Sequence, residues 1–483
     1  MDYKEEFLDL LNDNRFEEAR ILLERNKQYA NEDPFFYGNM GWLLVHMERY
    51  QEAEIYLLKG IHLFEDDGWM YSQLGFCYHR QGRIEDGIQA LYKALDYGYE
   101  ESWVYAEIGW GYKELGDYKQ AVSVFEDCLM DDPNNAWVLS QAAACYAFLH
   151  RDEDALDYYL KSYRILPDSD ACFDLANYYH EHKQYRDEIQ YLKQIKDEES
   201  IVWKEFQLAR AYLLLQEPNV ALQHLLVAEK AGRDDTSFHS LMADTYMALH
   251  QVEEANDHYN RALQYYERAL LLEKDHGWIY QEMIWIAHKQ KDWNKKLSYL
   301  ERASKEKKED LWLTYHFARC YSDLHRYPEA IDACVQCMKL GEKGADILDL
   351  YAWNLGRNKQ YEDAIDVLFE RMQKTDADDW CYGELGSNYM QLQDYATAFE
   401  FFEKGSAMTQ DPAYFQSMMG MCQFQLQNYQ KALEYFHEAE ELGRKDSWLY
   451  TSMGETLTKL QRYCEADTYF DKAKEIESVS SVE

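Results

Sequence analysis

The stretch Ser102–Ala121, SWVYAEIGWGYKELGDYKQA, decides the fold of this chain. Residues at i, i+3, i+4 and i+7, the spacing of a buried helical face, are Tyr105, Ile108, Gly109 and Tyr112. The glycine at Gly116 then ends this helix before a second one begins. Trp103 and Trp110 lie off the buried stripe and are seven residues apart, so they share another face of the same helix. The stretch therefore predicts a helical hairpin that carries a second aromatic face.

The same pattern recurs along the chain at a spacing of 34 residues. Two one-residue deletions and one seven-residue insertion bring fourteen reference positions into register. These positions are Phe7, Gly41, Gly75, Gly109, Ala143, Ala176, Ala209, Ala243, Ile284, Ala318, Ala352, Gly386, Gly420 and Gly454. All but Phe7 and Ile284 are small, and an atypical terminal repeat is expected in repeat arrays.

A second small position follows each reference position by twelve residues. It is occupied by Ala19, Ala53, Gly87, Ala121, Ala155, Ala221, Ala255, Ala330, Ala364, Ala398, Ala432 and Ala466. Glu188 and Lys296 break the rule. Three residues before this position the chain usually has an aromatic residue, as at Tyr118. Two antiparallel helices approach closely only where both carry small side chains, so the two positions predict paired helices in each repeat.

This spacing resembles the tetratricopeptide repeat (TPR) from about residue 1 to about residue 475. In the fourth repeat the matching residues are Tyr105, Ile108, Gly109, Tyr112, Gly116, Tyr118, Ala121, Phe125 and Pro133. The resemblance implies an all-α protein, a right-handed α-solenoid of about 14 helix-turn-helix repeats, with the first helix of each repeat on the concave face. A tryptophan two residues before the tyrosine, as at Trp103, is similar to a bacterial-type Trp-x-Tyr variant of the family.

The insertion lies in the eighth repeat, where YNRAL at Tyr259 is followed by YERAL at Tyr266. Seven residues are close to two helical turns, so the second helix can lengthen and keep its face. We therefore expect repeats 1 to 8 over residues 1–275, with a helix extension near 264–270, and repeats 9 to 14 over 276–475. The last residues, 476–483, are expected to fray.

Tryptophan occupies two positions on the first helices. Six residues before the reference position lie Trp69, Trp103, Trp137, Trp203, Trp278, Trp312, Trp380 and Trp448. Directly after it lie Trp42, Trp110, Trp285 and Trp353, with Phe76 in the third repeat. The first position is filled in most repeats and is expected to seal the seams between them. The second position varies from repeat to repeat, as binding surfaces do.

The candidate partner-binding residues therefore lie in the N-terminal groove. They are Trp42, Phe76 and Trp110, with Trp69 and Trp103 beside them. Small residues between the two aromatic positions, such as Gly38 and Ser72, would leave shallow pockets suited to an extended peptide or a partner helix. The alternative is that the aromatic rings only pack the repeats together.

The formal net charge of -39, from 89 acidic and 50 basic residues, disfavours nucleic acid or an anionic membrane as a direct partner and is compatible with a basic protein. Acidic pairs such as Asp66-Asp67 precede the first helices, where carboxylates cap free amides; an acidic rim for a basic partner is the other interpretation. The chain has no signal-peptide pattern and no apolar run of 18 residues, which predicts no membrane association and a cytoplasmic location.

Motifs for catalysis, metals or cofactors are absent from the sequence. Cys334 and Cys337 spell CxxC but fall on the buried stripe of a second helix, and His180 and His182 point to different helix faces. We therefore predict no enzyme activity, catalytic residue, metal or cofactor, and a scaffold, adaptor or regulator that binds another protein or peptide. The alternative is an acidic inhibitor or nucleic-acid mimic that binds a basic, nucleic-acid-binding protein. The oligomeric state does not follow from the sequence.

Overall fold

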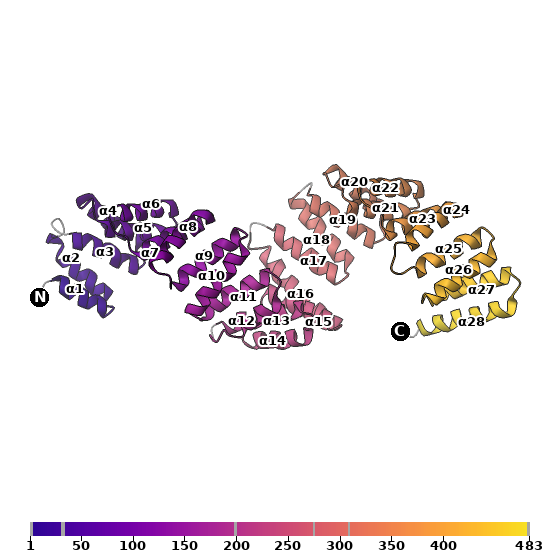
Figure 1. Cartoon of the computed structure of the whole chain (residues 1–483), viewed down its shortest axis with the longest axis horizontal. Coiled ribbons are helices and arrows are strands. Elements are labelled where there is room, and N and C mark those ends of the chain that lie inside the picture. The colour runs from indigo at the N-terminus through magenta and orange to yellow at the C-terminus, as the bar shows by residue number, and fades with distance from the viewer. Residues whose placement is uncertain (1–2, 30–33, 198–199, 274–275, 308–309, 481–483) are drawn as a thin grey trace. The chain divides into compact units, whose positions relative to one another are not determined.

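A computed structural model describes residues 3–29, 34–197, 200–273, 276–307 and 310–480. These residues form twenty-eight α-helices and one short 3-10 helix, η1 (Lys27–Tyr29), and contain no strand. The helices follow one another in pairs joined by short turns, and within each of two compact parts of the chain neighbouring pairs pack against each other (Figure 1). The predicted all-α solenoid of about fourteen helix pairs is confirmed.

The bounds of the helices follow the repeat. The first helices of the pairs are α1 (Tyr3–Asn12), α3 (Pro34–His46), α5 (Gly68–Arg80), α7 (Ser102–Glu114), α9 (Ala136–Phe148), α11 (Ser169–Glu181), α13 (Ile201–Leu214), α15 (Thr236–Ala248), α17 (Gly277–Lys289), α19 (Leu311–Asp323), α21 (Ala345–Arg357), α23 (Asp379–Gln391), α25 (Ala413–Gln425) and α27 (Ser447–Lys459). The second helices are α2 (Phe16–Arg25), α4 (Tyr50–Leu63), α6 (Ile84–Asp96), α8 (Tyr118–Asp131), α10 (Asp152–Ile165), α12 (Tyr185–Leu192), α14 (Pro218–Lys230), α16 (Val252–Ala269), α18 (Trp293–Glu306), α20 (Tyr327–Lys339), α22 (Tyr361–Lys374), α24 (Tyr395–Ser406), α26 (Tyr429–Glu441) and α28 (Tyr463–Ser480).

The chain divides into two compact parts, which we call module 1 (Met1–His258) and module 2 (Tyr259–Glu483). The division falls inside α16, the helix of 18 residues that carries the inserted heptad, and earlier than the boundary expected at residue 275. Within the described part of the chain, no helix is both long and apolar enough to cross a membrane.

The turn between the two helices of each pair has the same backbone geometry throughout. Seven residues after each reference position lies a residue with positive φ: Asn14, Glu48, Gly82, Gly116, His150, Lys183, Gln216, His250, Lys291, His325, Lys359, Gln393, Gln427 and Gln461. At Gly116, φ is 78°, and the next amide, of Asp117, donates to the carbonyl of Tyr112 at 2.9 Å. This is a left-handed helix end that satisfies free carbonyls of the first helix. It occurs in all fourteen repeats, including the first, so it fixes the register of the array.

Carboxylates cap many of the first helices, as the acidic pairs predict. The Oδ1 atom of Asp67 accepts from the amide of Met70 at 2.9 Å, and the same contact starts α15, α19 and α23 at Asp235, Asp310 and Asp378. Glu101 makes no such contact, and α9 is capped by Asn135 instead of the acidic pair before it. Glu309 lies outside the described residues. Capping therefore accounts for the acidic pairs that end at Asp67, Asp235 and Asp310 and the one that begins at Asp378.

The small reference position lets the second helix pack closely against the first. A Cβ added at Gly109 would lie 2.5 Å from the ring of Phe125, sixteen residues later, and one added at Gly386 would lie 2.6 Å from the ring of Phe402. Phe125 and Phe402 are fully buried. The glycine thus receives a large side chain of the second helix, and a larger residue there would push the pair apart.

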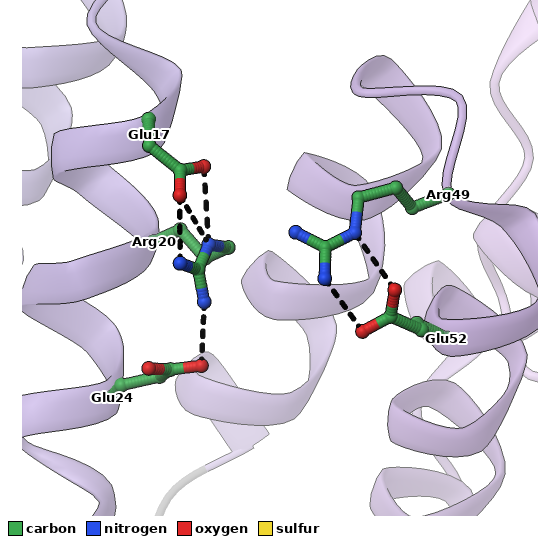
Figure 2. Close-up of polar contacts among 5 residues, drawn as sticks. All are labelled: Glu17, Arg20, Glu24, Arg49 and Glu52. Atoms are coloured by element: carbon green, nitrogen blue, oxygen red, sulfur yellow. Dashed lines mark hydrogen bonds and ion pairs between the residues drawn. The ribbon is translucent and has the colours of Figure 1, made fainter.

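Arginines at the start of several second helices pair within the same helix. Arg49 contacts Glu52 at 2.7 Å, and Arg20 lies between Glu17 and Glu24 at 2.7 Å from each (Figure 2). The Arg49 arrangement recurs at Arg15, Arg83, Arg151, Arg326 and Arg462, each paired with an acidic residue three positions later. These exposed pairs contribute little to stability individually, and they engage basic side chains locally.

The last helix, α28, continues into the C-terminal segment. The tail expected to fray from residue 476 is helical to Ser480, and residues 481–483 lie outside the described part. Ile476 packs against the apolar cluster of α26 and α27, and the Ser447 hydroxyl donates to the carboxylate of Glu477 at 2.5 Å. These contacts continue the last helix beyond the repeat consensus.

Candidate functional site

Three aromatic residues from consecutive repeats frame a cavity in module 1. Trp42 of α3, Phe76 of α5 and Trp103 of α7 line a space of about 380 Å³. The remaining lining residues are Val45, His46, Glu48, Tyr50, Gln73 and Arg80. We call this space the aromatic cavity. Aromatic rings form much of its wall, and His46, Glu48, Gln73 and Arg80 contribute polar groups, a combination suited to one large side chain with polar contacts at its edge.

The ring of Trp42 is held on two sides. The imidazole of His46 lies one helical turn later with its centroid 3.8 Å away, and its Nδ1 atom bonds the carbonyl of Trp42 at 2.9 Å. Phe16 of the preceding repeat meets Trp42 edge to face at 6.4 Å. Because these contacts fix the indole before any ligand binds, less conformational entropy is lost on binding.

Besides Glu48, the aromatic cavity has a second charged lining residue, Arg80. Its guanidinium lies 4.6 Å from the centroid of Phe76, one turn earlier on α5, and the residue is exposed. Trp103 also lines the cavity, and Tyr99 packs edge to face against it at 6.2 Å. The cavity can therefore take an apolar side chain and, at its edge, a carbonyl or carboxylate.

The structure brings together three of the five candidate partner-binding residues and leaves two apart. Trp42, Phe76 and Trp103 come together, whereas Trp69 and Trp110 are not among the lining residues. The Trp69 ring fills the space above Gly38, where a Cβ would collide with it. Trp110 packs against the buried ring of His79 at 5.1 Å, and His79 in turn contacts Glu107 at 3.1 Å.

The prediction of shallow pockets at the small residues between the aromatic positions is wrong at Gly38 and Ser72. Gly38 receives the Trp69 ring, and Ser72 is fully buried, with its hydroxyl donating to the Trp69 carbonyl at 2.7 Å. The small side chains make room for the next repeat. A cavity forms instead between the aromatic residue after one reference position and the tryptophan of the following repeat.

Sequence reasoning missed the polar residues of the aromatic cavity. His46 and Arg80 each follow an aromatic residue by four positions, which places both side chains on one helix face. The same signal marks Arg357, whose guanidinium lies 3.8 Å from the ring of Trp353. Trp353 and Trp380 line a cavity of about 540 Å³ in module 2, and they are 27 residues apart, as are Phe76 and Trp103. An aromatic pair at this spacing, followed by a cation, could have identified both cavities.

The cysteine pair and the histidine pair that were considered as metal ligands take part in packing and hydrogen bonding. Cys334 and Cys337 are fully buried, and burial raises the pKa of the Cys334 thiol to about 12. His180 contacts Glu188 while His182 contacts the carbonyl of Tyr178. No group of three or more potential metal ligands is found among the described residues.

Comparison with known proteins identifies the repeat. The sequence model described as "Tetratricopeptide repeat" matches residues 36–67, 104–135 and 381–411, which cover the helix pairs α3–α4, α7–α8 and α23–α24. No curated protein matches the chain.

Several solved structures are similar to the chain in part. The APC/C hetero-tetramer Cut9–Hcn1 shares 15% identity over 97% of this chain and 92% of that chain, with a TM-score of 0.42. A tetratricopeptide repeat protein from Parabacteroides merdae shares 14% over 52% of this chain and 96% of that chain, with a TM-score of 0.41. MamA from Desulfovibrio magneticus shares 20% over 35% of this chain and 96% of that chain, with a TM-score of 0.34.

Stacked repeats of this class present extended surfaces on which other proteins bind. The three matched segments share their register with the other helix pairs, because all fourteen turns have the same backbone geometry. The chain is a tetratricopeptide repeat protein with the architecture of a protein-interaction scaffold.

Proposed function

We propose that this chain is a non-catalytic, cytoplasmic scaffold, adaptor or regulator that binds another protein or peptide through its N-terminal groove. The observation that carries the proposal is the aromatic cavity of about 380 Å³ framed by Trp42, Phe76 and Trp103. Its volume suits one large apolar side chain of a peptide or a partner helix. Large aromatic residues around such a pocket are typical of the few positions that dominate binding energy.

The polar residues around the aromatic cavity suit a peptide backbone. Gln73 is buried and offers an amide, and Arg80 offers a guanidinium already oriented by its stacking on Phe76. Trp110 and Trp69 would extend the contact surface on either side. Neither cofactor nor metal enters this proposal, because side-chain burial and hydrogen bonding are sufficient for binding.

The alternative, an acidic inhibitor of a basic nucleic-acid-binding protein, is supported by a second cavity. Three carboxylates, of Asp168, Asp170 and Asp174, line a space of about 450 Å³ beside Trp137. Two of them already have partners in the chain: Asp168 caps α11 at Ala171, and Asp174 accepts from the hydroxyl of Ser140 at 2.5 Å. Their placement is explained by local structure, so we favour the aromatic cavity.

The test is selection of peptides from a random displayed library on the full-length chain, followed by affinity measurement. Trp42→Ala and Phe76→Ala should each weaken binding of the selected peptides by about tenfold or more, since each removes a wall of the pocket. Trp285→Ala is the matched control, because Trp285 occupies the same repeat position and is 51% exposed.

Equal binding by the wild type and both cavity variants would contradict the proposal. Binding that survives Trp42→Ala but is lost in moderate salt would favour the acidic alternative, because surface charges are screened over about 10 Å.

The division between contact and seam residues has its own test. Trp42→Ala and Trp110→Ala should lower the midpoint of thermal unfolding less than Trp69→Ala does, because the Trp69 ring fills the space above Gly38. Trp103 packs against the apolar cluster of Ile88 and Val104 and also lines the aromatic cavity, so Trp103→Ala should lower both stability and affinity. Equal destabilisation by all four would remove the distinction.

A further inference from the structure

Two charged residues occupy the small position of the second helices, where the other repeats have alanine or glycine. Glu188 of α12 is 2% exposed and Lys296 of α18 is 1% exposed. Burying a charge at a helix-helix contact is costly unless another charge or a hydrogen bond compensates it. The two sites can be compared residue by residue because both have the same place in the repeat.

The first site, which we call the 6/7 seam, consists of His180, Glu188, Gln207 and Arg210. The Nδ1 atom of His180 lies 3.0 Å from the carboxylate of Glu188. Burial lowers the pKa of Arg210, and the negative charge of Glu188 opposes that effect. The carboxylate therefore supplies the counter-charge for the basic side chains around it.

The second site, which we call the 9/10 seam, consists of His288, Lys296, His316 and Arg319, at the same positions in repeats 9 and 10. All four side chains are basic. The ring of Trp293 holds two of them together, with its centroid 5.5 Å from Nζ of Lys296 and 5.3 Å from the ring of His288. At the position where the 6/7 seam has the acidic Glu188, the 9/10 seam has the basic Lys296.

Three side chains of the 9/10 seam, those of His288, Lys296 and His316, have no hydrogen-bond partner for a polar atom within the described residues, whereas Arg319 donates to the hydroxyl of Tyr315 at 3.4 Å. Lys296 has neither a hydrogen bond nor an ion pair there, and the Nδ1 atoms of His288 and His316 are buried without a hydrogen bond. Burial lowers the pKa of His316 to about 4, and the charges of Lys296 and Arg319 lower it further. Burial also lowers the pKa of Lys296. Lys296, Arg319 and His288 thus disfavour the charged form of His316.

Acidic side chains near the 9/10 seam are engaged elsewhere or face solvent. Asp323, on α19, is exposed and forms no ion pair with Lys296 among the described residues, although its negative charge favours the charged forms of Lys296 and His288 and partly offsets the effect of burial. Asp346 and Asp349 line the cavity beside Arg319, and Asp349 contacts Arg371 at 3.1 Å. The thiol of Cys320 donates to the carbonyl of Trp293, and burial raises its pKa to about 11, so it stays uncharged near neutral pH. The seam therefore has no carboxylate equivalent to Glu188.

We propose that His288, Lys296, His316 and Arg319 form a binding site for one oxyanion, a carboxylate or phosphate group, which supplies the charge that Glu188 supplies in the 6/7 seam. Arg319 is exposed, and so are the rings of Trp285 and Trp312, which pack against His288 and His316, so the anion approaches from the side of these rings. An ammonium, a guanidinium and two imidazoles provide enough donors for the oxygens of either group.

The test uses isothermal titration of the full-length chain with inorganic phosphate, with acetate, and with chloride at matched ionic strength. We expect saturable binding of phosphate, acetate or both, and none of chloride. The two oxyanions distinguish a phosphate group from a carboxylate as the natural ligand. Lys296→Met should weaken binding by about tenfold or more, because one charged donor is lost. Lys305→Met, which removes an exposed lysine of the same helix, should leave it unchanged.

Proton uptake gives a second readout. Anion binding favours the charged forms of the imidazoles, so at about pH 6.5 the chain should take up protons on binding, seen as a dependence of the heat on the buffer's ionisation enthalpy. Arg319→Gln alters an exposed side chain, is expected to fold, and should also weaken binding. Saturable binding that is equally strong in Lys296→Met and Arg319→Gln, or an equal effect of chloride, would overturn the proposal.

Discussion

The 6/7 and 9/10 seams share their geometry and differ in the sign of one buried charge. In the first, Glu188 lies beside His180 and near Arg210; in the second, Lys296 lies beside His288 and near Arg319. The comparison shows that the repeat tolerates a large charged residue where alanine is usual. It also shows that the first seam contains its own counter-charge, while the second combines like charges.

The largest effect should follow from making the first seam resemble the second. Glu188→Lys removes the acceptor of His180 and places a second cation near Arg210. We expect the free energy of unfolding to fall by roughly 3–5 kcal/mol, the usual result of leaving buried charge uncompensated. Urea-induced unfolding measures it.

Glu188→Gln is the control for this change, because it keeps the shape and a hydrogen bond to His180 and should cost less. If Glu188→Lys were as stable as the wild type, the counter-charge interpretation of the 6/7 seam would be refuted.

At the 9/10 seam we expect a substitution to raise the free energy of unfolding. Lys296→Met keeps the length of the side chain and removes a buried amine that has no partner among the described residues. In the absence of phosphate and carboxylates it should raise the free energy of unfolding by about 1–3 kcal/mol. Thermal unfolding of this variant beside Lys305→Met measures the effect. A loss of stability would mean that Lys296 is already compensated.

The smallest effect is a difference in pH dependence. The pKa of His316 is lowered from its ordinary value to about 4, so between about pH 6.5 and pH 4 the unfolded chain binds a proton that the folded chain does not. The contribution of His316 to stability is therefore complete above about pH 6.5 and is lost progressively as the pH falls to about 4. His316→Gln should show a shallower decline of the unfolding midpoint over this range. An identical decline in both proteins would contradict the assignment.

The fold could be predicted because the residues that determine the structure of each repeat lie close together in the sequence. Gly109 must be small to receive Phe125, the chain must turn after the first helix at Gly116, and Asp67 caps the helix that follows it. These are contacts between residues close in sequence, and their recurrence makes the register visible. The first repeat illustrates this, because Asn14 takes the same turn conformation as Gly116 although Phe7 departs from the consensus.

The candidate site could be predicted only in outline. The sequence indicated which aromatic residues share a face, but Trp69 and Trp103 have the same place in the repeat, and only Trp103 lines the aromatic cavity. Whether such a ring fills the space of a neighbouring glycine or stands beside a cavity depends on the side chains of two adjoining repeats. A pattern within one repeat does not contain that information.

The sequence by itself determined the all-α repeat, its register and the two exceptional residues, Glu188 and Lys296. Only the tertiary structure decided that both are buried, that His180 contacts one of them, and that the other lies among basic side chains. The physical reason is that helix formation and turns depend on local spacing. Burial and charge compensation instead depend on side chains brought together from different repeats.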